Sequence, residues 1–144
     1  MRRAACQLTV PPQPTQEVPH AGTTASPGRG GMLRKPNPAV ITTLRQDGQP
    51  VSTATWHVRD DGPVLMNMDK GRKRPEHMRN DPRFVLDALD DSDWHTHVTV
   101  TGHVEETRED TGPAGIDRPA RQHTGRPHPQ RDRRRISTWL AADG

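Results

Sequence analysis

The hydrophobic and polar positions in the first half of the chain follow the two-residue period of β-strands. Residues 39–44 are apolar or β-branched, residues 51–58 alternate small and β-branched side chains, and residues 63–68 form a third apolar run. One Asp-Gly pair at 47–48 and another at 61–62 separate these runs, and Asp-Gly between two β-prone runs is a strong hairpin signal. The pattern therefore predicts three antiparallel strands in succession, a meander.

The second half of the chain adds further strand patterns. Residues 84–89 and 97–105 are expected to form the fourth and fifth strands, and Gly102 marks a possible bulge in the fifth. Residues 136–140 fit a last strand. Five or six short strands joined by Asp-Gly turns, with small helices between them, predict a mainly β fold built as a small barrel.

Two helical segments interrupt this β pattern. Pro75 suits the first turn of a short helix that residues 77–80 complete, and Pro82 prevents its continuation. Residues 116–123 have a helical pattern, but Pro119 lies inside it. A proline in a helix interior costs about 3 kcal/mol, so we expect this helix to break or kink there.

The N-terminal part of the chain lacks these patterns. Residues 1–31 are rich in proline, which cannot donate ladder or helix hydrogen bonds, and include the flexible run at 28–31. The apolar residues concentrate in 39–104, and a chain of 144 residues leaves little room for a second domain. We expect a disordered Pro/Gly-rich tail at 1–31, followed by one β-barrel domain at 32–144.

Charge and cysteine content narrow the class of protein. The formal net charge of +3 favours anionic partners, either phosphate-bearing small molecules or nucleic acid. The single cysteine, Cys6, excludes an intrachain disulfide framework and fits a reducing cytoplasm. No apolar run approaches the roughly 18 residues needed to span a membrane. A cytoplasmic protein without a membrane partner is therefore expected.

The most distinctive polar stretch lies between the third and fourth predicted strands. Gly71 is followed by three consecutive cations, Arg72, Lys73 and Arg74, and then by Pro75. Glycine lets the backbone approach an anion closely, and the cations supply charge, so the stretch suits a phosphate-binding loop. The alternative is an ordinary solvated basic turn between two strands.

Two other polar groups suggest different chemistry. His95, His97 and His103 lie on one predicted strand segment, but zinc needs three or four ligands, usually with cysteine or carboxylate support. The basic run at 131–135 resembles a nucleic-acid patch, yet single-strand binders stack bases on aromatic residues, which make up only 3% of this chain. We expect no metal site and no nucleic-acid partner.

Seven segments of the chain stand in order and at characteristic spacings: residues 38–44, 47–50, 55–56, 71–83, 98–104, 116–118 and 124–127. Together they resemble the split β-barrel flavin and deazaflavin oxidoreductases, which are the pyridoxamine-5′-phosphate-oxidase-like proteins, and in particular the branch that uses coenzyme F420. The chain departs from the family pattern at Glu76, often basic there, and at His77, often asparagine.

The resemblance implies an FMN-binding-protein-like split barrel that forms a homodimer with a cofactor at the interface. F420 is the implied cofactor and FMN the alternative. The cofactor would transfer a hydride to or from a small organic substrate, and the family needs no catalytic side chain for this. A non-catalytic member that binds a phosphate-bearing ligand is the second possibility.

By position, the resemblance also assigns cofactor-binding residues. The three loop cations would bind the phosphate, strand residues would line the ring and the ribityl chain, and one tryptophan would wall the pocket from the partner subunit. In that order, these residues are Arg72, Lys73 and Arg74, then Thr53, Thr55, Met66, Asn67 and Met68, and finally Trp94.

Overall fold

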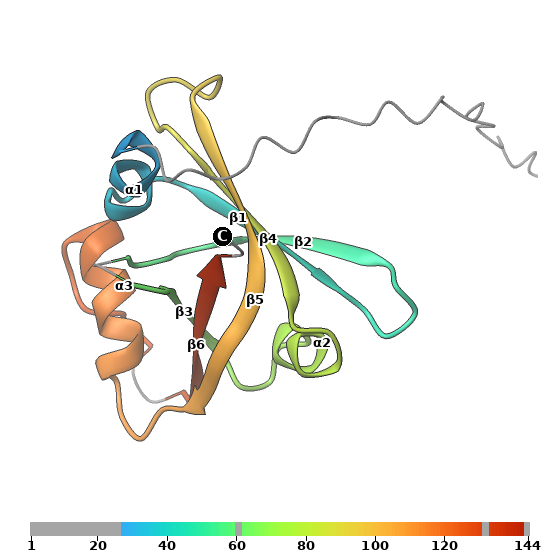
Figure 1. Ribbon diagram of the computed structural model, residues 1–144. Coiled ribbons are helices and arrows are strands. Elements are labelled where there is room, and N and C mark those ends of the chain that lie inside the picture. Colours follow the sequence, from blue (N-terminus) through green and yellow to red (C-terminus); the bar gives the residue numbers. More distant parts are fainter. Residues whose placement is uncertain (1–26, 60–61, 131–132, 143–144) are drawn as a thin grey trace, which may run out of the picture.

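The computed structural model describes residues 27–59, 62–130 and 133–142, and within them it contains three helices and six strands (Figure 1). The helices are α1 (Pro27–Arg34), α2 (Arg74–Asn80) and α3 (Ala114–Thr124). The strands are β1 (Ala39–Leu44), β2 (Pro50–Thr55), β3 (Val64–Asp69), β4 (Arg83–Leu89), β5 (His97–Glu109) and β6 (Arg135–Ala142).

The strands form one antiparallel sheet in the order β2-β1-β4-β5-β6-β3, which curls into a barrel. Strands β2 and β3 are consecutive in the chain but lie at the two edges of the sheet. Among the described residues, one isolated bridge joins Val58, which follows β2, to Leu65 of β3, with Val58 N–Leu65 O at 3.0 Å and Leu65 N–Val58 O at 2.8 Å. The barrel is therefore split between β2 and β3, and the predicted mainly β split barrel is confirmed.

The predicted meander is right for its first hairpin and wrong for its third strand. Strands β1 and β2 pair as expected, and Gly48 in their turn adopts a φ of 83°, which glycine tolerates without strain. Strand β3 pairs with β6 instead of β2. Its residues Val64, Met66 and Met68 are all buried, whereas every residue of β2 is at least partly exposed. Strand β3 therefore pairs where its apolar side chains can be buried in the core, to which β2 contributes no buried residue.

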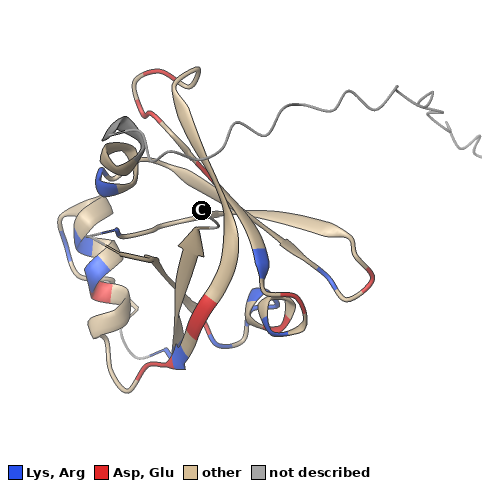
Figure 2. Ribbon diagram, viewed as in Figure 1, with Lys and Arg blue, Asp and Glu red and all other residues tan. Residues whose placement is uncertain are grey.

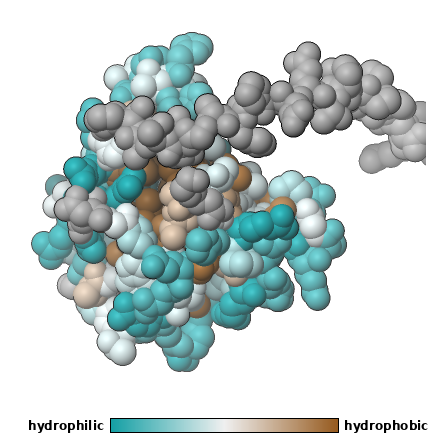
Figure 3. All heavy atoms as spheres, in the orientation of Figure 1, coloured by the Kyte–Doolittle hydropathy of each residue, from teal (hydrophilic) through white to brown (hydrophobic). Residues whose placement is uncertain are grey.

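The core lies inside the barrel and follows the alternation of the strands. Ile41 of β1, Leu86 of β4, Met66 of β3 and Leu140 of β6 are at most 1% exposed, and Met78 of α2 joins them at one end. Burying a side chain of this size contributes roughly 1.5–3 kcal/mol. On the face shown in Figure 3, apolar residues gather near the centre and polar residues surround them.

Strand β5 is longer than predicted, and its bulge is not at Gly102. Gly102 pairs regularly with Phe84 and Ala142, and the register shifts instead between Val104 and Glu106. A Cβ atom at Gly102 would collide with the Ala141 carbonyl. Glycine at this position therefore allows β6 to lie close to β5.

The helices differ from the sequence prediction at two places. Residues 27–31, expected in the disordered tail, belong to α1, whereas residues 1–26 of that tail lie outside the described residues. Helix α2 ends at Asn80 before Pro82, as predicted. Helix α3 continues through Pro119, so the predicted break is wrong. The proline ring is buried, which offsets part of the cost of its missing hydrogen bond.

The same three helices have no membrane-spanning candidate among them. Within 27–59, 62–130 and 133–142, no helix has the length and apolar character needed to cross a bilayer.

Candidate functional site

An open cavity of about 840 Å³ lies where the barrel is split. Both edge strands line it, β2 with Thr53 and Thr55 and β3 with Asn67 and Met68. The loop that follows β3 contributes residues 72–74, and the start of α2 continues this wall. The cavity is therefore bounded by the two free edges of the sheet and by the basic loop that connects β3 to α2.

Arg74 is the most buried of the three consecutive cations. Its side chain is half-buried, and its Nη1 donates to the Thr55 hydroxyl at 3.4 Å, while its Nε is buried without a partner. Within the described residues, no carboxylate lies within 4.0 Å of its guanidinium. Burial, followed by the neighbouring Arg72, lowers the pKa of Arg74. A buried cation without a counter-charge suits an anionic ligand.

Arg72 and Lys73 extend this positive charge toward solvent. Arg72 Nε lies 3.8 Å from Asp69 Oδ2, and Lys73 Nζ lies 3.8 Å from Glu76 Oε2. Both cations are exposed, and exposed pairs at such distances contribute little to stability. Their charges are therefore available to a ligand. Figure 2 shows Lys and Arg gathered around α2 and the loop before it.

A buried ion pair holds the base of this loop. The Arg135 side chain is 6% exposed, and its Nη1 lies 2.6 Å from Asp69 Oδ1. Its Nη2 donates to the Gln130 carbonyl at 2.7 Å, and the Lys70 amide donates to the Arg134 carbonyl at 2.9 Å. Buried charges need such pairing. The end of β3 is thereby fixed to the start of β6, which positions the loop.

Aromatic and imidazole rings also line the cavity. His123 of α3 stacks on Trp56, with ring centroids 5.8 Å apart and an interplanar angle of 13°, and His128 meets the same indole edge-on at 5.9 Å. His123 Nε2 lies 2.9 Å from the His57 carbonyl oxygen, and burial lowers the pKa of His123. These residues offer flat rings, whereas the loop offers positive charge.

His57 lies behind this ring cluster and does not line the cavity. It is 0% exposed, and neither ring nitrogen has a hydrogen-bond partner among the described residues. Burial, with a smaller effect of His123, lowers the pKa of His57 from 6.5 to about 4. His57 is therefore a neutral, structural residue at neutral pH.

The structure brings most of the predicted cofactor-binding residues to one cavity. Met66 instead lies in the core with 0% exposure, because on β3 it faces the barrel interior. Trp94 is 76% exposed in the β4–β5 turn and is not among the lining residues. Its proposed role requires a second subunit and stays a prediction. The predicted residues that line the cavity are Thr53, Thr55, Asn67, Met68, Arg72, Lys73 and Arg74.

Sequence reasoning missed several cavity residues. Thr43, His77, His123 and His128 line it, although the chain separates them by up to 85 positions. No spacing pattern links such residues, so only the fold could bring them together. Within the described part of the chain, no group of three or more His, Cys, Asp or Glu side chains is placed to hold a metal ion.

Comparisons with known structures place this geometry in a known fold. The chain is similar to an F420 reductase, with 19% identity and a TM-score of 0.75 over 83% of this chain and 96% of that one. It is also similar to a conserved hypothetical protein from Mycobacterium tuberculosis, with 18% identity and a TM-score of 0.64 over 85% and 82%. A heme storage protein from Vibrio cholerae follows with 11% identity and a TM-score of 0.57 over 83% and 90%.

The family of the chain is established by its amino-acid sequence. No curated protein matches the chain by sequence. The family model for pyridoxamine 5′-phosphate oxidase, however, matches residues 31–142, which include all the strands described above. The chain therefore belongs to the pyridoxamine 5′-phosphate oxidase family.

Proposed function

We propose that the chain binds a flavin-type cofactor through its phosphate and acts as an oxidoreductase on a small organic substrate. The observation that carries this proposal is Arg74, a half-buried guanidinium that faces the cavity without a carboxylate partner among the described residues. A phosphate bound there would supply the missing counter-charge, and a planar guanidinium binds phosphate oxygens in pairs.

The rest of the cavity fits such a ligand in size and chemistry. Its volume of about 840 Å³ lies in the range of about 300–1,000 Å³ that is usual for small-molecule sites. The hydroxyls of Thr53 and Thr55 offer hydrogen bonds along β2, and Met68 offers an apolar surface. When bound, the cofactor supplies the hydride chemistry, whereas these residues hold and orient it.

F420 is the proposed cofactor and FMN the alternative. The similarity to an F420 reductase supports the first choice. Family membership supports a flavin-type ligand in general.

Binding is tested by titrating the purified chain with F420 and with FMN while following tryptophan fluorescence and cofactor absorption. Trp56 lines the cavity, whereas Trp139 contacts Arg108 and is not among the lining residues. We therefore expect quenching that Trp139→Phe retains and Trp56→Phe largely removes. If neither cofactor binds below roughly 1 mM by either signal, the proposed function is wrong.

We also propose that the chain forms a homodimer that closes the cavity. Thr53 is exposed on β2, so the cavity is open along this edge. Val40, Leu44 and Val85 are partly exposed on the outer face of β1 and β4, opposite the core residues of the same strands. Apolar residues on an outer sheet face are typical of a surface that another chain covers.

Sedimentation equilibrium measures this assembly directly. We expect a particle of twice the chain mass of 16.1 kDa, and we expect Val85→Glu to shift it to the single-chain mass because a charge would enter the interface. A wild-type chain that sediments at the single-chain mass at every concentration would rule out the homodimer.

A further inference from the structure

Three histidines line the cavity, and their hydrogen-bond partners differ. His128 Nδ1 accepts from the Gln130 amide at 3.1 Å and lies 3.4 Å from Arg135 Nη2. Both partners are donors only, so a proton on this nitrogen would break the contacts. His123 is held between Trp56 and the His57 backbone, in a partly buried position that disfavours charge. The ring nitrogens of His123 and His128 that make these contacts are therefore already engaged.

The third cavity histidine, His77, has a partner that accepts either protonation state. Its Nδ1 lies 3.3 Å from the Thr43 hydroxyl oxygen. A threonine hydroxyl donates to a neutral imidazole nitrogen and accepts from a protonated one. His77 can therefore gain a proton on Nδ1 without losing this contact, which leaves an Nε2–H group as a second donor.

The position of His77 on α2 places it beside the loop cations. Arg74 is three residues before it and Lys73 four, the spacings at which helix side chains are neighbours. The His77 amide donates to the Lys73 carbonyl at 3.1 Å, and His77 is half-buried. An anion held by Arg74 would therefore lie close to the imidazole.

The electrostatic surroundings of His77 depend on whether an anion is present. Strands β1 and β2 contribute only uncharged residues to the cavity. The charged residues come from the end of β3, the basic loop, the start of α2, the β4–β5 turn and the start of β6. A bound phosphate would add negative charge beside the imidazole, and a nearby opposite charge favours the protonated form. The charged side chains that line the cavity are Asp69, Arg72, Lys73, Arg74, Asp91 and Arg135.

We propose that His77 is a phosphate-binding residue whose imidazole takes up a proton from solvent when the ligand binds. The proton enters at Nδ1, and the resulting imidazolium lies against the phosphate with Arg74. By linkage, affinity for the phosphate-bearing ligand then rises as pH falls from about 8 to about 6, the range in which histidine changes charge. This inference rests on the proposed cofactor binding.

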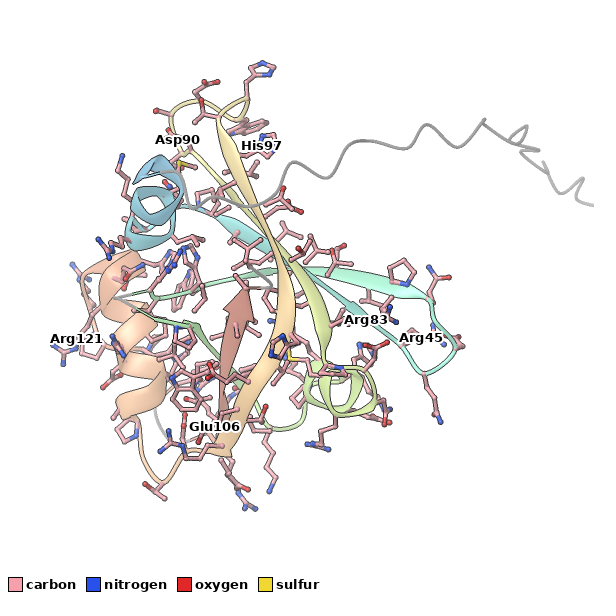
Figure 4. The ribbon with its side chains drawn as sticks, viewed as in Figure 1. Arg45, Arg83, Asp90, His97, Glu106 and Arg121 are labelled. Atoms are coloured by element: carbon pink, nitrogen blue, oxygen red, sulfur yellow. The ribbon has the colours of Figure 1, made fainter. Side chains whose placement is uncertain are left out.

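The test is isothermal titration calorimetry with FMN and with riboflavin, which lacks the phosphate. Wild-type chain, His77→Asn and the control His97→Asn are each titrated at about pH 6, 7 and 8. His97 lies at the β4–β5 end of the molecule and is not among the residues that line the cavity (Figure 4). Two buffers of different ionisation enthalpy at each pH give the number of protons taken up.

We expect the FMN affinity ratio of wild type to His77→Asn to grow about tenfold between pH 8 and pH 6. The FMN phosphate titrates near pH 6 itself, but that contribution is common to all variants and cancels in the ratio. Riboflavin is expected to bind each variant with a ratio that does not depend on pH. His97→Asn should match wild type throughout.

The outcomes separate this inference from the proposed function. FMN binding to His77→Asn with the wild-type proton uptake and pH dependence overturns the role of His77 and leaves cofactor binding intact. Absence of FMN and F420 binding to the wild type overturns both. If His77→Asn does not fold, as judged by circular dichroism, His77→Gln replaces it. The pH dependence of the FMN affinity ratio of wild type to His77→Gln then tests the role of His77.

Discussion

Replacing Arg74 by methionine is expected to weaken FMN and F420 binding about a hundredfold, or ~2.8 kcal/mol. Methionine keeps the apolar stem of the side chain and removes the guanidinium. The loss is large because Arg74 is half-buried, lacks a carboxylate partner among the described residues and lies on the cavity wall. Fluorescence titration with each cofactor measures the change.

The same substitution is expected to raise the melting temperature of the ligand-free chain. Burial and Arg72 both disfavour the charge on Arg74, as its lowered pKa indicates, so removing the charge relieves that cost. A substitution that raises the melting temperature but weakens cofactor binding would identify Arg74 as a functional residue.

Two further variants test whether the effect on cofactor binding is specific to Arg74. Arg79→Met, an exposed position on the same helix, should leave cofactor affinity unchanged. The double substitution of Arg72 and Lys73 by alanine should cost about tenfold, or ~1.4 kcal/mol, because both cations are exposed. Wild-type affinity in Arg74→Met would place the phosphate elsewhere.

The free energy of unfolding is expected to fall by as much as ~3 kcal/mol between about pH 7 and pH 4 through His57. Folding lowers the pKa of this buried residue from 6.5 to about 4, so the unfolded chain binds its proton first. The stability that His57 contributes is fully present above pH 6.5. It is lost as pH falls from there through the folded value near 4.

Urea denaturation at several pH values measures this dependence, and His57→Met removes it while keeping an apolar side chain in the buried position. The pH dependence of the wild type must be compared with that of His57→Met, because carboxylates such as Asp90 and Glu109, whose pKa values are lowered by their partners, also lose stabilising interactions as pH falls. Equal pH slopes for wild type and His57→Met would show that His57 is not the source.

Local signals in the sequence predicted local structure well. Asp47-Gly48 correctly located the β1–β2 hairpin, because the glycine takes the positive φ that the turn requires. The partner of β3 depended on which distant strand could cover its buried residues, and a local turn signal at 61–62 carries no such information. Pro119 misled for a related reason, since its effect on α3 depends on the packing of the helix.

The candidate site also contains residues that local sequence can predict and residues that only the fold brings together. The loop cations are consecutive in the sequence, so their common location could be predicted from it. Met66 follows the strand period into the core, which the periodicity alone indicates, whereas only the family resemblance implies a pocket role for it. His77 and His123 reach the cavity through contacts with Thr43 and Trp56, which depend on the whole barrel.

Strand β2 lines the cavity without contributing to the core. The core cluster draws on each of the other five strands, including the edge strand β3, whereas β2 has one strand partner and supplies residues to the cavity but none to the core. Exposed edge positions such as Thr53 can change with little effect on stability. A barrel of this design can therefore acquire new ligand specificities over evolutionary time without first becoming more stable.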